Sequence, residues 1–285
     1  METIVVGFDG SQPALEALRW AADEAEMRHW NVVLVQSWQE PVLTDVAWVA
    51  VWDDLEESKR RVQEDLEALA AEFAAERPTI SFSAQLVTGP AGRVLADPES
   101  GAAMVVVGAR GLGGFSSLLL GSVSRKVAAR APSTVVVVRA PGNAEGEIVV
   151  GVDGSDDSRK ALAWAADAAR LRGRPLRVVM AWSYLMPEGP DGPEPFQPDY
   201  SAADASRALK NVVDEVLGED PGVELVLEAT CALAAKALIE RSKDASLLVV
   251  GPRDRSMHSR IDLGSVTAQL LHHAPCPIAV VRVRS

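Results

Sequence analysis

Residues 4–28 read IVVGFDGSQPALEALRWAADEAEMR, and this segment decides the fold. It begins with a short apolar run, passes through the polar residues DGS, and continues with apolar and alanine residues at helical spacing. Further short apolar runs and helical patterns alternate along the chain. Strands that are apolar throughout and separated by helices indicate a parallel sheet covered on both faces. The sequence therefore predicts an α/β fold.

The same segment occurs a second time, as IVVGVDGSDDSRKALAWAADAARLR at residues 148–172. Two later stretches also recur, VVVGARG at 105–111 as LVVGPRD at 248–254, and residues 118–139 as residues 261–282. Such repetition indicates a tandem duplication. The connecting stretch APGNAEGE, residues 140–147, is polar and rich in glycine, as expected of a domain boundary. We predict two domains, residues 1–140 and 147–285.

Each half is predicted to be a Rossmann-like domain with a five-stranded parallel sheet between layers of helices. In the first half the expected strands are residues 4–8, 31–38, 81–88, 102–109 and 134–140, and the expected helices are 14–28, 54–76, 92–99 and 122–131. Residues 42–54, with Trp48 and Trp52, and residues 186–200 occupy matching connections in the two halves. They are interpreted as loops that pack over the domain edge or as a lid or docking surface.

The composition restricts the class of partner. The formal net charge of −12 argues against nucleic acid or an anionic membrane, because both are polyanions. Two distant cysteines, Cys231 and Cys276, without metal-ligand spacing, are typical of reduced thiols in a cytoplasmic protein. The sequence shows no secretion signal, and no apolar run approaches the roughly 18 residues that span a membrane. We expect a cytoplasmic protein.

Unusual residues follow two of the predicted strands. The first strand ends in VGFDGS, which places Asp9 at its carboxyl end, and the fourth ends in VVVGARG. Ligands of open parallel sheets bind beyond the carboxyl ends of the strands, so the two loops should meet. Gly108 and Gly111 lack a Cβ, which allows the backbone to turn sharply and lie against a ligand. Because the layout recurs in both halves, it favours an anion site over ordinary turns.

The start of the following helix adds to this site. Gly121 and Ser122 open the helix, and Ser122 either caps its free N–H groups or donates a hydrogen bond to a phosphate. Arg110 supplies a positive charge.

The spacing Gly108-x-x-Gly111, nine residues, then Gly121-Ser122 resembles the nucleotide-binding motif of the universal stress protein family. VGFDGS and the endings APSTVVVVR and APCPIAVVR are also similar to that family. The resemblance covers essentially the whole chain, as two consecutive domains of the adenine nucleotide alpha hydrolase-like type. It implies ATP binding, with Mg²⁺ as a candidate accompanying ion for which Asp9 is the candidate ligand.

The resemblance also implies roles for individual residues. Asp9 would contact the adenosine, with Gly7 beside it, and the backbone of residues 35–37, ending at Ser37, would lie against adenine. The residues expected around ribose and phosphates are Gly108, Arg110, Gly111, Gly121, Ser122 and Val123. The corresponding positions of the second half are Gly151, Asp153, Gly251, Arg253, Gly264, Ser265 and Val266.

The second site is expected to be weaker, because Asp254 stands where the first half has Gly111. The added Cβ and carboxylate are both unfavourable near phosphates. The family resemblance further implies pairing through the fifth strands, within one chain or in a homodimer.

Three functions remain open at this stage. The first is a nucleotide-sensitive regulator of the stress response that acts through a protein partner. The second is a weak ATP hydrolase or a nucleotide or phosphoryl transferase, and the third is an interaction module with vestigial nucleotide sites. Dedicated catalysis is disfavoured, because the sequence shows no paired carboxylates, catalytic triad or zinc-ligand spacing, and Lys126 falls inside a helix rather than at a Walker position.

Overall fold

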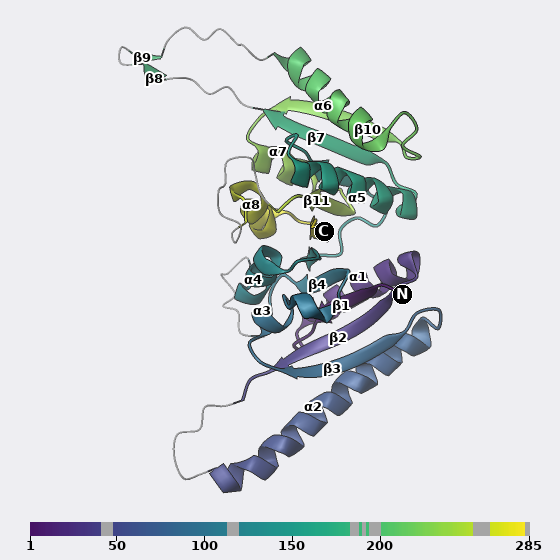
Figure 1. Ribbon diagram of the computed structural model, residues 1–285, viewed down its shortest axis with the longest axis vertical. Helices are drawn as coiled ribbons and strands as arrows, with labels where there is room; N and C mark the ends of the chain where they lie inside the picture. The colour runs from purple at the N-terminus through teal and green to yellow at the C-terminus, as the bar shows by residue number, and fades with distance from the viewer. Residues whose placement is uncertain are drawn as a thin grey trace. The chain divides into compact units, whose positions relative to one another are not determined.

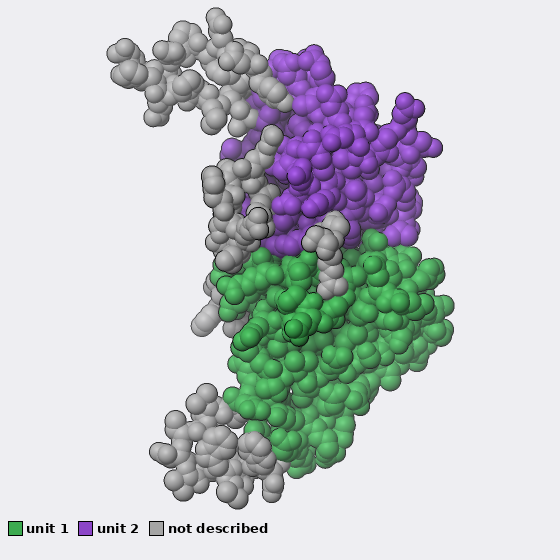
Figure 2. Space-filling model, viewed as in Figure 1, with its two compact units in different colours: residues 1–141, 283–285 green, residues 142–282 purple. Residues whose placement is uncertain are grey.

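The computed structural model describes residues 1–40, 48–112, 120–182, 188–189, 192–193, 201–252 and 263–282, with residues 48–54, 188–189 and 192–193 as backbone only. These residues fall into two compact units, Met1–Pro141 and Gly142–Arg282 (Figure 2). Each unit is described separately below.

The first unit is built on a parallel sheet (Figure 1). Its strands are β1 (Thr3–Gly7), β2 (Asn31–Trp38), β3 (Phe82–Thr88), β4 (Met104–Gly108) and β5 (Thr134–Val138). They lie in the order β5-β4-β1-β2-β3, and all neighbouring strands are parallel. The chain moves from β1 to one side through β2 and β3, and then to the other side through β4 and β5. The strand order therefore reverses between β1 and β4, which is where open α/β sheets bind ligands.

Helices cover both faces of this sheet. They are α1 (Gln12–Arg28), α2 (Trp48–Glu76), α3 (Ala91–Val94), the 3-10 helix η1 (Pro98–Ser100) and α4 (Ser122–Arg130). The face that carries Gly108 lies against Pro13 at the start of α1, whereas the opposite face, which carries Gly7, lies against Leu95 at the end of α3. Helix α1 is rich in alanine, and its fully buried residues Ala17, Ala21 and Ala25 allow close packing.

Local sequence explains where two helices begin and end. Helix α1 begins after Ser11, whose hydroxyl accepts a hydrogen bond from the Ala14 N–H at 3.3 Å. The helix predicted over residues 92–99 is instead divided into α3 and η1. Asp97 is extended, with φ −68° and ψ 122°, because Pro98 disfavours helical backbone at the preceding residue. Helix α2 begins six residues earlier than predicted, at Trp48 rather than residue 54.

The second unit repeats this architecture. Its elements are β6 (Ile148–Gly151), α5 (Asp156–Arg172), β7 (Leu176–Trp182), β8 (Glu188–Gly189), β9 (Gly192–Pro193), α6 (Ala202–Leu217), β10 (Leu225–Cys231), α7 (Ala234–Arg241), β11 (Leu247–Val250), α8 (Ser265–His273) and β12 (Ile278–Val280). The parallel order is β10-β7-β6-β11-β12, equivalent to that of the first unit. The predicted fold class, two tandem Rossmann-like units, is confirmed. The predicted pairing through β5 and β12 stays a prediction.

Strands β8 and β9 form a short antiparallel pair within the segment 186–200, most of which lies outside the described residues. Within the part of the chain that the structure describes, no helix combines the length and the apolar character that crossing a bilayer requires.

Candidate functional site

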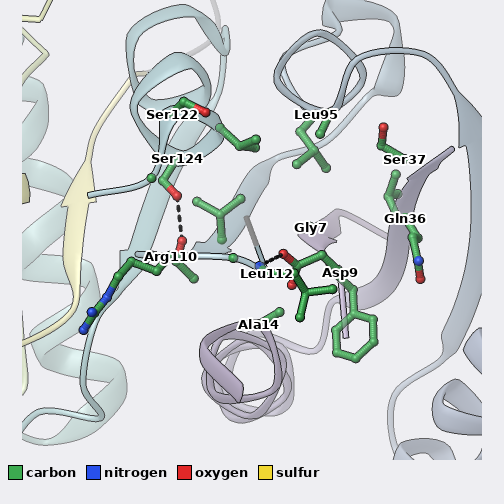
Figure 3. A pocket seen from close by; sticks show the side chains of 18 of the residues that line it. Gly7, Asp9, Ala14, Gln36, Ser37, Leu95, Arg110, Leu112, Ser122 and Ser124 are labelled. Carbon is green, nitrogen blue, oxygen red and sulfur yellow. Dashed lines mark hydrogen bonds between the residues drawn. The ribbon is translucent and has the colours of Figure 1, made fainter. Parts of the chain in front are cut away.

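A cavity of about 500 Å³ lies in the first unit at the carboxyl ends of β1, β2 and β4 (Figure 3). All nine residues that the sequence predicted for this half line it, namely Gly7, Asp9, Ser37, Gly108, Arg110, Gly111, Gly121, Ser122 and Val123. The structure thus brings together three segments that are far apart in the sequence. The size of the cavity falls within the range of small-molecule sites, roughly 300–1,000 Å³.

The carboxylate of Asp9 connects the loops after β1 and β4. Its Oδ1 accepts a hydrogen bond from the Ser11 N–H at 3.1 Å, and its Oδ2 accepts one from the Leu112 N–H at 3.0 Å. Figure 3 shows the second bond crossing one side of the cavity. The expected meeting of the two strand ends therefore occurs, and Asp9 is the residue that joins them.

The glycines lie where parts of the protein approach one another closely, Gly108 against backbone and the other two against side chains. A Cβ on Gly108 would lie 2.6 Å from the Pro13 carbonyl oxygen, and a Cβ on Gly111 would overlap the Asp9 carboxylate. A Cβ on Gly7 would lie 2.6 Å from Cδ1 of Leu95. None of these three glycines has a positive φ. Their role is to let the two loops and α1 pack together, rather than to provide left-handed turns.

The N-terminus of α4 forms another wall of the cavity. The N-cap is Gly121, which has no side chain to accept a helix N–H, so the suggestion that Ser122 is the cap is wrong. Ser122 is instead the exposed first residue of the helix. The first N–H groups of a helix have no acceptor within the helix, and its N-terminus carries about half a positive charge. This end of α4 therefore offers hydrogen-bond donors and a positive potential to an anion.

Two hydrogen bonds hold α4 against the end of β4. The Gly121 N–H donates to the Ala109 carbonyl at 2.8 Å, and the buried Ser124 hydroxyl donates to the Gly108 carbonyl at 2.7 Å. Lys126 lies inside α4, in its second turn, as predicted. Its side chain packs against Gly92. The orientation of the helix start is thus set by contacts to the strand.

Arg110 is exposed, and Figure 3 shows its side chain directed away from Asp9 and Ser122. Burial lowers the pKa of the Arg139 guanidinium, and the nearby charge of Arg110 lowers it further. Arg110 therefore lies at the margin of the cavity close to another cation, rather than across the cavity from Asp9.

The opposite wall comes from β2 and α3. The Ser37 hydroxyl donates a hydrogen bond to the Gly89 carbonyl, which ties the end of β2 to the turn before α3. Val35 and Gln36 line the cavity with Ser37, as predicted for residues 35–37. Sequence reasoning missed several other lining residues, namely Phe8, Ala14, Gln39, Ala91, Leu95, Val107, Leu112 and Ser124. Most of these are neighbours of predicted residues in the same loops, so the motif positions themselves were the available signal. Leu95 has no such signal, because only the fold brings it to the cavity.

The second unit reproduces much of this geometry. Gly151 approaches Leu238 and Gly251 approaches Asp157, as Gly7 and Gly108 approach Leu95 and Pro13. The Gly264 N–H donates to the Pro252 carbonyl at 2.9 Å, and α8 begins with Ser265 and Val266. The Thr267 hydroxyl donates to the Gly251 carbonyl at 2.9 Å, which is the bond that Ser124 makes in the first unit.

Asp153 is the predicted acidic residue at the carboxyl end of β6. Its Oδ1 accepts hydrogen bonds from both the N–H and the hydroxyl of Ser155. Arg253 and Asp254 lie outside the described residues, as do the side chains of Trp48 and Trp52.

The donor set of the first cavity fits a magnesium ion poorly when the protein acts alone. Asp9 is the one carboxylate among the described lining residues, so the protein would supply a single charged ligand to the ion. Among the described residues, no group of three or more His, Cys, Asp or Glu side chains gathers at one point. A magnesium ion that keeps most of its ligands from phosphates and water would place little demand on the protein.

The fold and this cavity define a doubly wound α/β protein with a ligand-sized cavity at the point where strand order reverses, in a chain that carries the same fold twice. The model of the universal stress protein family matches residues 1–139 and 146–282, and the chain belongs to that family.

Relatives of the same length support this assignment. The chain is 31% identical over 294 residues to a universal stress protein of Mycolicibacterium smegmatis, covering 99% of this chain and 97% of the relative. It is 30% identical over 290 residues to a universal stress protein of Mycobacterium tuberculosis, covering 98% and 96%. The crystal structure of a universal stress protein from Archaeoglobus fulgidus matches with a TM-score of 0.72 at 19% identity, covering 99% of this chain and 98% of that chain. That last match shows a shared fold.

Proposed function

We propose that the first unit binds ATP and that the chain is a cytoplasmic, nucleotide-sensitive regulator of the stress response. The observation that carries this proposal is the cavity of about 500 Å³ with the Asp9 carboxylate on one side and the N-terminus of α4, whose N-cap is a glycine, on the other. In a nucleoside phosphate the ribose carries hydroxyl donors and the phosphates beyond it are anionic, and this cavity offers an acceptor for the former and an anion-binding helix end for the latter.

The nucleotide would change the protein through Asp9. Asp9 Oδ2 now accepts the Leu112 N–H, and a ribose hydroxyl that drew the carboxylate toward the nucleotide would lengthen and weaken that bond. Losing the bond would release the loop after β4 from the loop after β1. A change in an exposed loop is a signal that a partner protein can read. We propose that this change at Leu112, caused by nucleotide binding at Asp9, is what the partner protein detects.

The hydrolase or transferase alternative gains no support from the cavity. Asp9 is the only carboxylate among its described lining residues, and no histidine or cysteine lines it. We propose that Asp9 accepts a ribose hydroxyl, so no second carboxylate among the described lining residues is left to act as a general base on water.

Nucleotide released from freshly purified protein, identified and counted by mass spectrometry, tests the proposal directly. Calorimetry on Asp9→Ala extends the test, with Asp153→Ala as the matched control at the same motif position of the second unit. Because a hydrogen bond to a charged group is worth about 1.5–3 kcal/mol, Asp9→Ala should weaken ATP binding at the first site by about ten- to a hundredfold. Asp153→Ala should leave that site unchanged. Equal effects of the two substitutions would refute the assignment to the first unit.

A further inference from the structure

The first unit contains a second cavity, of about 460 Å³, beside the one already described. It lies over β1, β2 and β3 on the sheet face that carries α3. Its floor is made of valine side chains, Val5, Val33, Val35 and Val87, and α3 contributes Val94 to its wall. Val5 and Val35 are almost fully buried, at 6% and 7% exposure. An apolar floor of this size resembles those of small-molecule sites.

The same sheet face in the second unit is spanned by charged side chains. Arg177 pairs with Glu147 at 2.5 Å and with Glu228 at 3.1 Å, and Arg241 pairs with Glu228 at 2.8 Å. We call these four residues the ion-pair ladder. Arg177, Glu147 and Glu228 are each at most 24% exposed, so the ladder lies against the sheet rather than in open solvent.

Strand registers identify the positions that replace the ladder in the first unit. Val5 pairs with Val33 and Val149 with Arg177, so Val33 stands in the place of Arg177. Val35 pairs with Gln85 and Val179 with Glu228, so Gln85 stands in the place of Glu228.

Thr3 stands in the place of Glu147, the remaining acidic residue of the ladder. Thr3 and Glu147 each accept, through their carbonyls, the N–H of the residue that precedes the fourth strand of the unit. Thr3, Val33 and Gln85 all line the second cavity and carry no charge. The cavity is therefore open where the second unit is filled by ion pairs.

The lining indicates the chemistry of the occupant. Charged side chains stand only at the exposed margin, where Arg93 contributes one cation and Asp97 and Glu99 two anions. Asp97 already accepts the Glu99 N–H at 2.9 Å. An ionised ligand on the valine floor would lose its hydration, whereas the counter-charges of the described lining residues stay at the exposed margin, so its burial is costly. The Gln85 amide offers a donor and an acceptor to a neutral polar group.

We infer that this second cavity binds a small, uncharged and mostly apolar molecule with one hydrogen-bonding group. The inference does not depend on nucleotide binding in the first cavity. The structure predicts one such site per chain, in the first unit, because the ladder occupies the equivalent face of the second.

Titration of the full chain with Nile red, an uncharged fluorophore whose emission shifts in apolar surroundings, tests the inference. The wild-type protein should bind the dye saturably at one site. Val33→Arg combined with Gln85→Glu would place ladder residues over the valines and should weaken binding by about tenfold or more, because the added side chains fill the cavity and charge its floor. Val87→Trp, which fills the cavity without charge, should have the same effect.

Arg177→Val combined with Glu228→Gln is the matched control, since it changes the corresponding positions of the second unit. It should leave dye binding at the first-unit site at wild-type affinity. Circular dichroism establishes that each variant is folded. The inference is overturned if the wild-type chain shows no saturable binding. It is also overturned if a first-unit variant that is folded, either Val33→Arg with Gln85→Glu or Val87→Trp, binds the dye as well as the wild-type protein does. It is equally overturned if the control loses binding to the same extent.

Discussion

Gly111 was predicted as a site residue, but the sequence indicated only one of the two reasons for a glycine there. The sequence predicted it as a place where backbone lies against a ligand. The structure adds a contact within the protein, because a Cβ at this position would overlap the Asp9 carboxylate. Asp9 in turn accepts the Leu112 N–H, so Gly111 and Asp9 act as one unit.

Gly111→Ala should lower ATP affinity by about tenfold, since it displaces the carboxylate that we propose contacts ribose. Its effect on the unfolding temperature should be small, because Gly111 lies in a partly exposed loop outside the core. Calorimetry on a double-mutant cycle provides the test: in an Asp9→Ala background, Gly111→Ala should cost little further affinity. Additive losses would show that the alanine acts on the nucleotide directly.

Predictability at the scale of the residue depended on motifs. Gly108, Gly121 and the other first-half motif residues line the cavity as expected. The start of α4 at residue 122 was predicted correctly, but the motif specifies neither that Gly121 is the N-cap nor that the Arg110 side chain points away from Asp9 (Figure 3).

At the scale of the element, strands were easier to predict than helix ends. Each first-unit strand lies within a residue or two of its predicted range, because apolar runs between polar loops are distinct. The division between α3 and η1 was missed, although Pro98 was the available signal. The early start of α2 at Trp48 was also missed, since the apolar residues there resemble a loop that packs on the domain edge.

The ion-pair ladder gives the second unit a pH-dependent contribution to stability. The hydrogen bonds and charge of Arg241, joined by those of Arg177, hold the pKa of Glu228 below its ordinary value of 4.5, although burial opposes the shift. A carboxyl whose pKa is lowered on folding stabilises the native state fully above its unfolded-state pKa. That contribution is lost as the pH falls below 4.5 and through the lower, folded-state pKa.

Glu228→Gln should therefore destabilise the protein at pH 7 by about 1–2 kcal/mol, because two arginines lose a charged acceptor. The difference from the wild-type protein should shrink as the pH is lowered below 4.5. Thermal unfolding followed between pH 3 and pH 7 measures this. A constant difference across that range would mean that packing, rather than charge, accounts for the effect.

At the scale of the whole molecule, two units with one architecture present unlike surfaces and unlike sites. The glycines, the helix start and the strand-end hydrogen bond are equivalent in both units. The sequence nevertheless places Asp254 where the first unit has Gly111, and this position lies beyond the described part of the second site. Repetition in the sequence predicted the shared fold, whereas the second cavity of the first unit depends on several strands at once and was not predictable.

We expect one strong nucleotide site per chain. Asp254→Gly should strengthen binding to the second unit by about 1–2 kcal/mol, because it removes a carboxylate and a Cβ from the proposed phosphate end. Calorimetry on the full chain, read as stoichiometry, checks this. Two equal sites before the substitution, with no gain after it, would show that Asp254 is harmless.

Helix α3 is only four residues long, and it is a partition between the two cavities of the first unit. Ala91 and the adjoining Leu95 face the first cavity, Arg93 and Val94 face the second, and Val35 lines both. A molecule that moved this partition from one side would change the shape met by a molecule on the other side. Thermodynamic linkage makes the influence mutual, so each occupant alters the affinity of the other by the same factor. The occupancy of each cavity would then depend on the concentrations of both compounds.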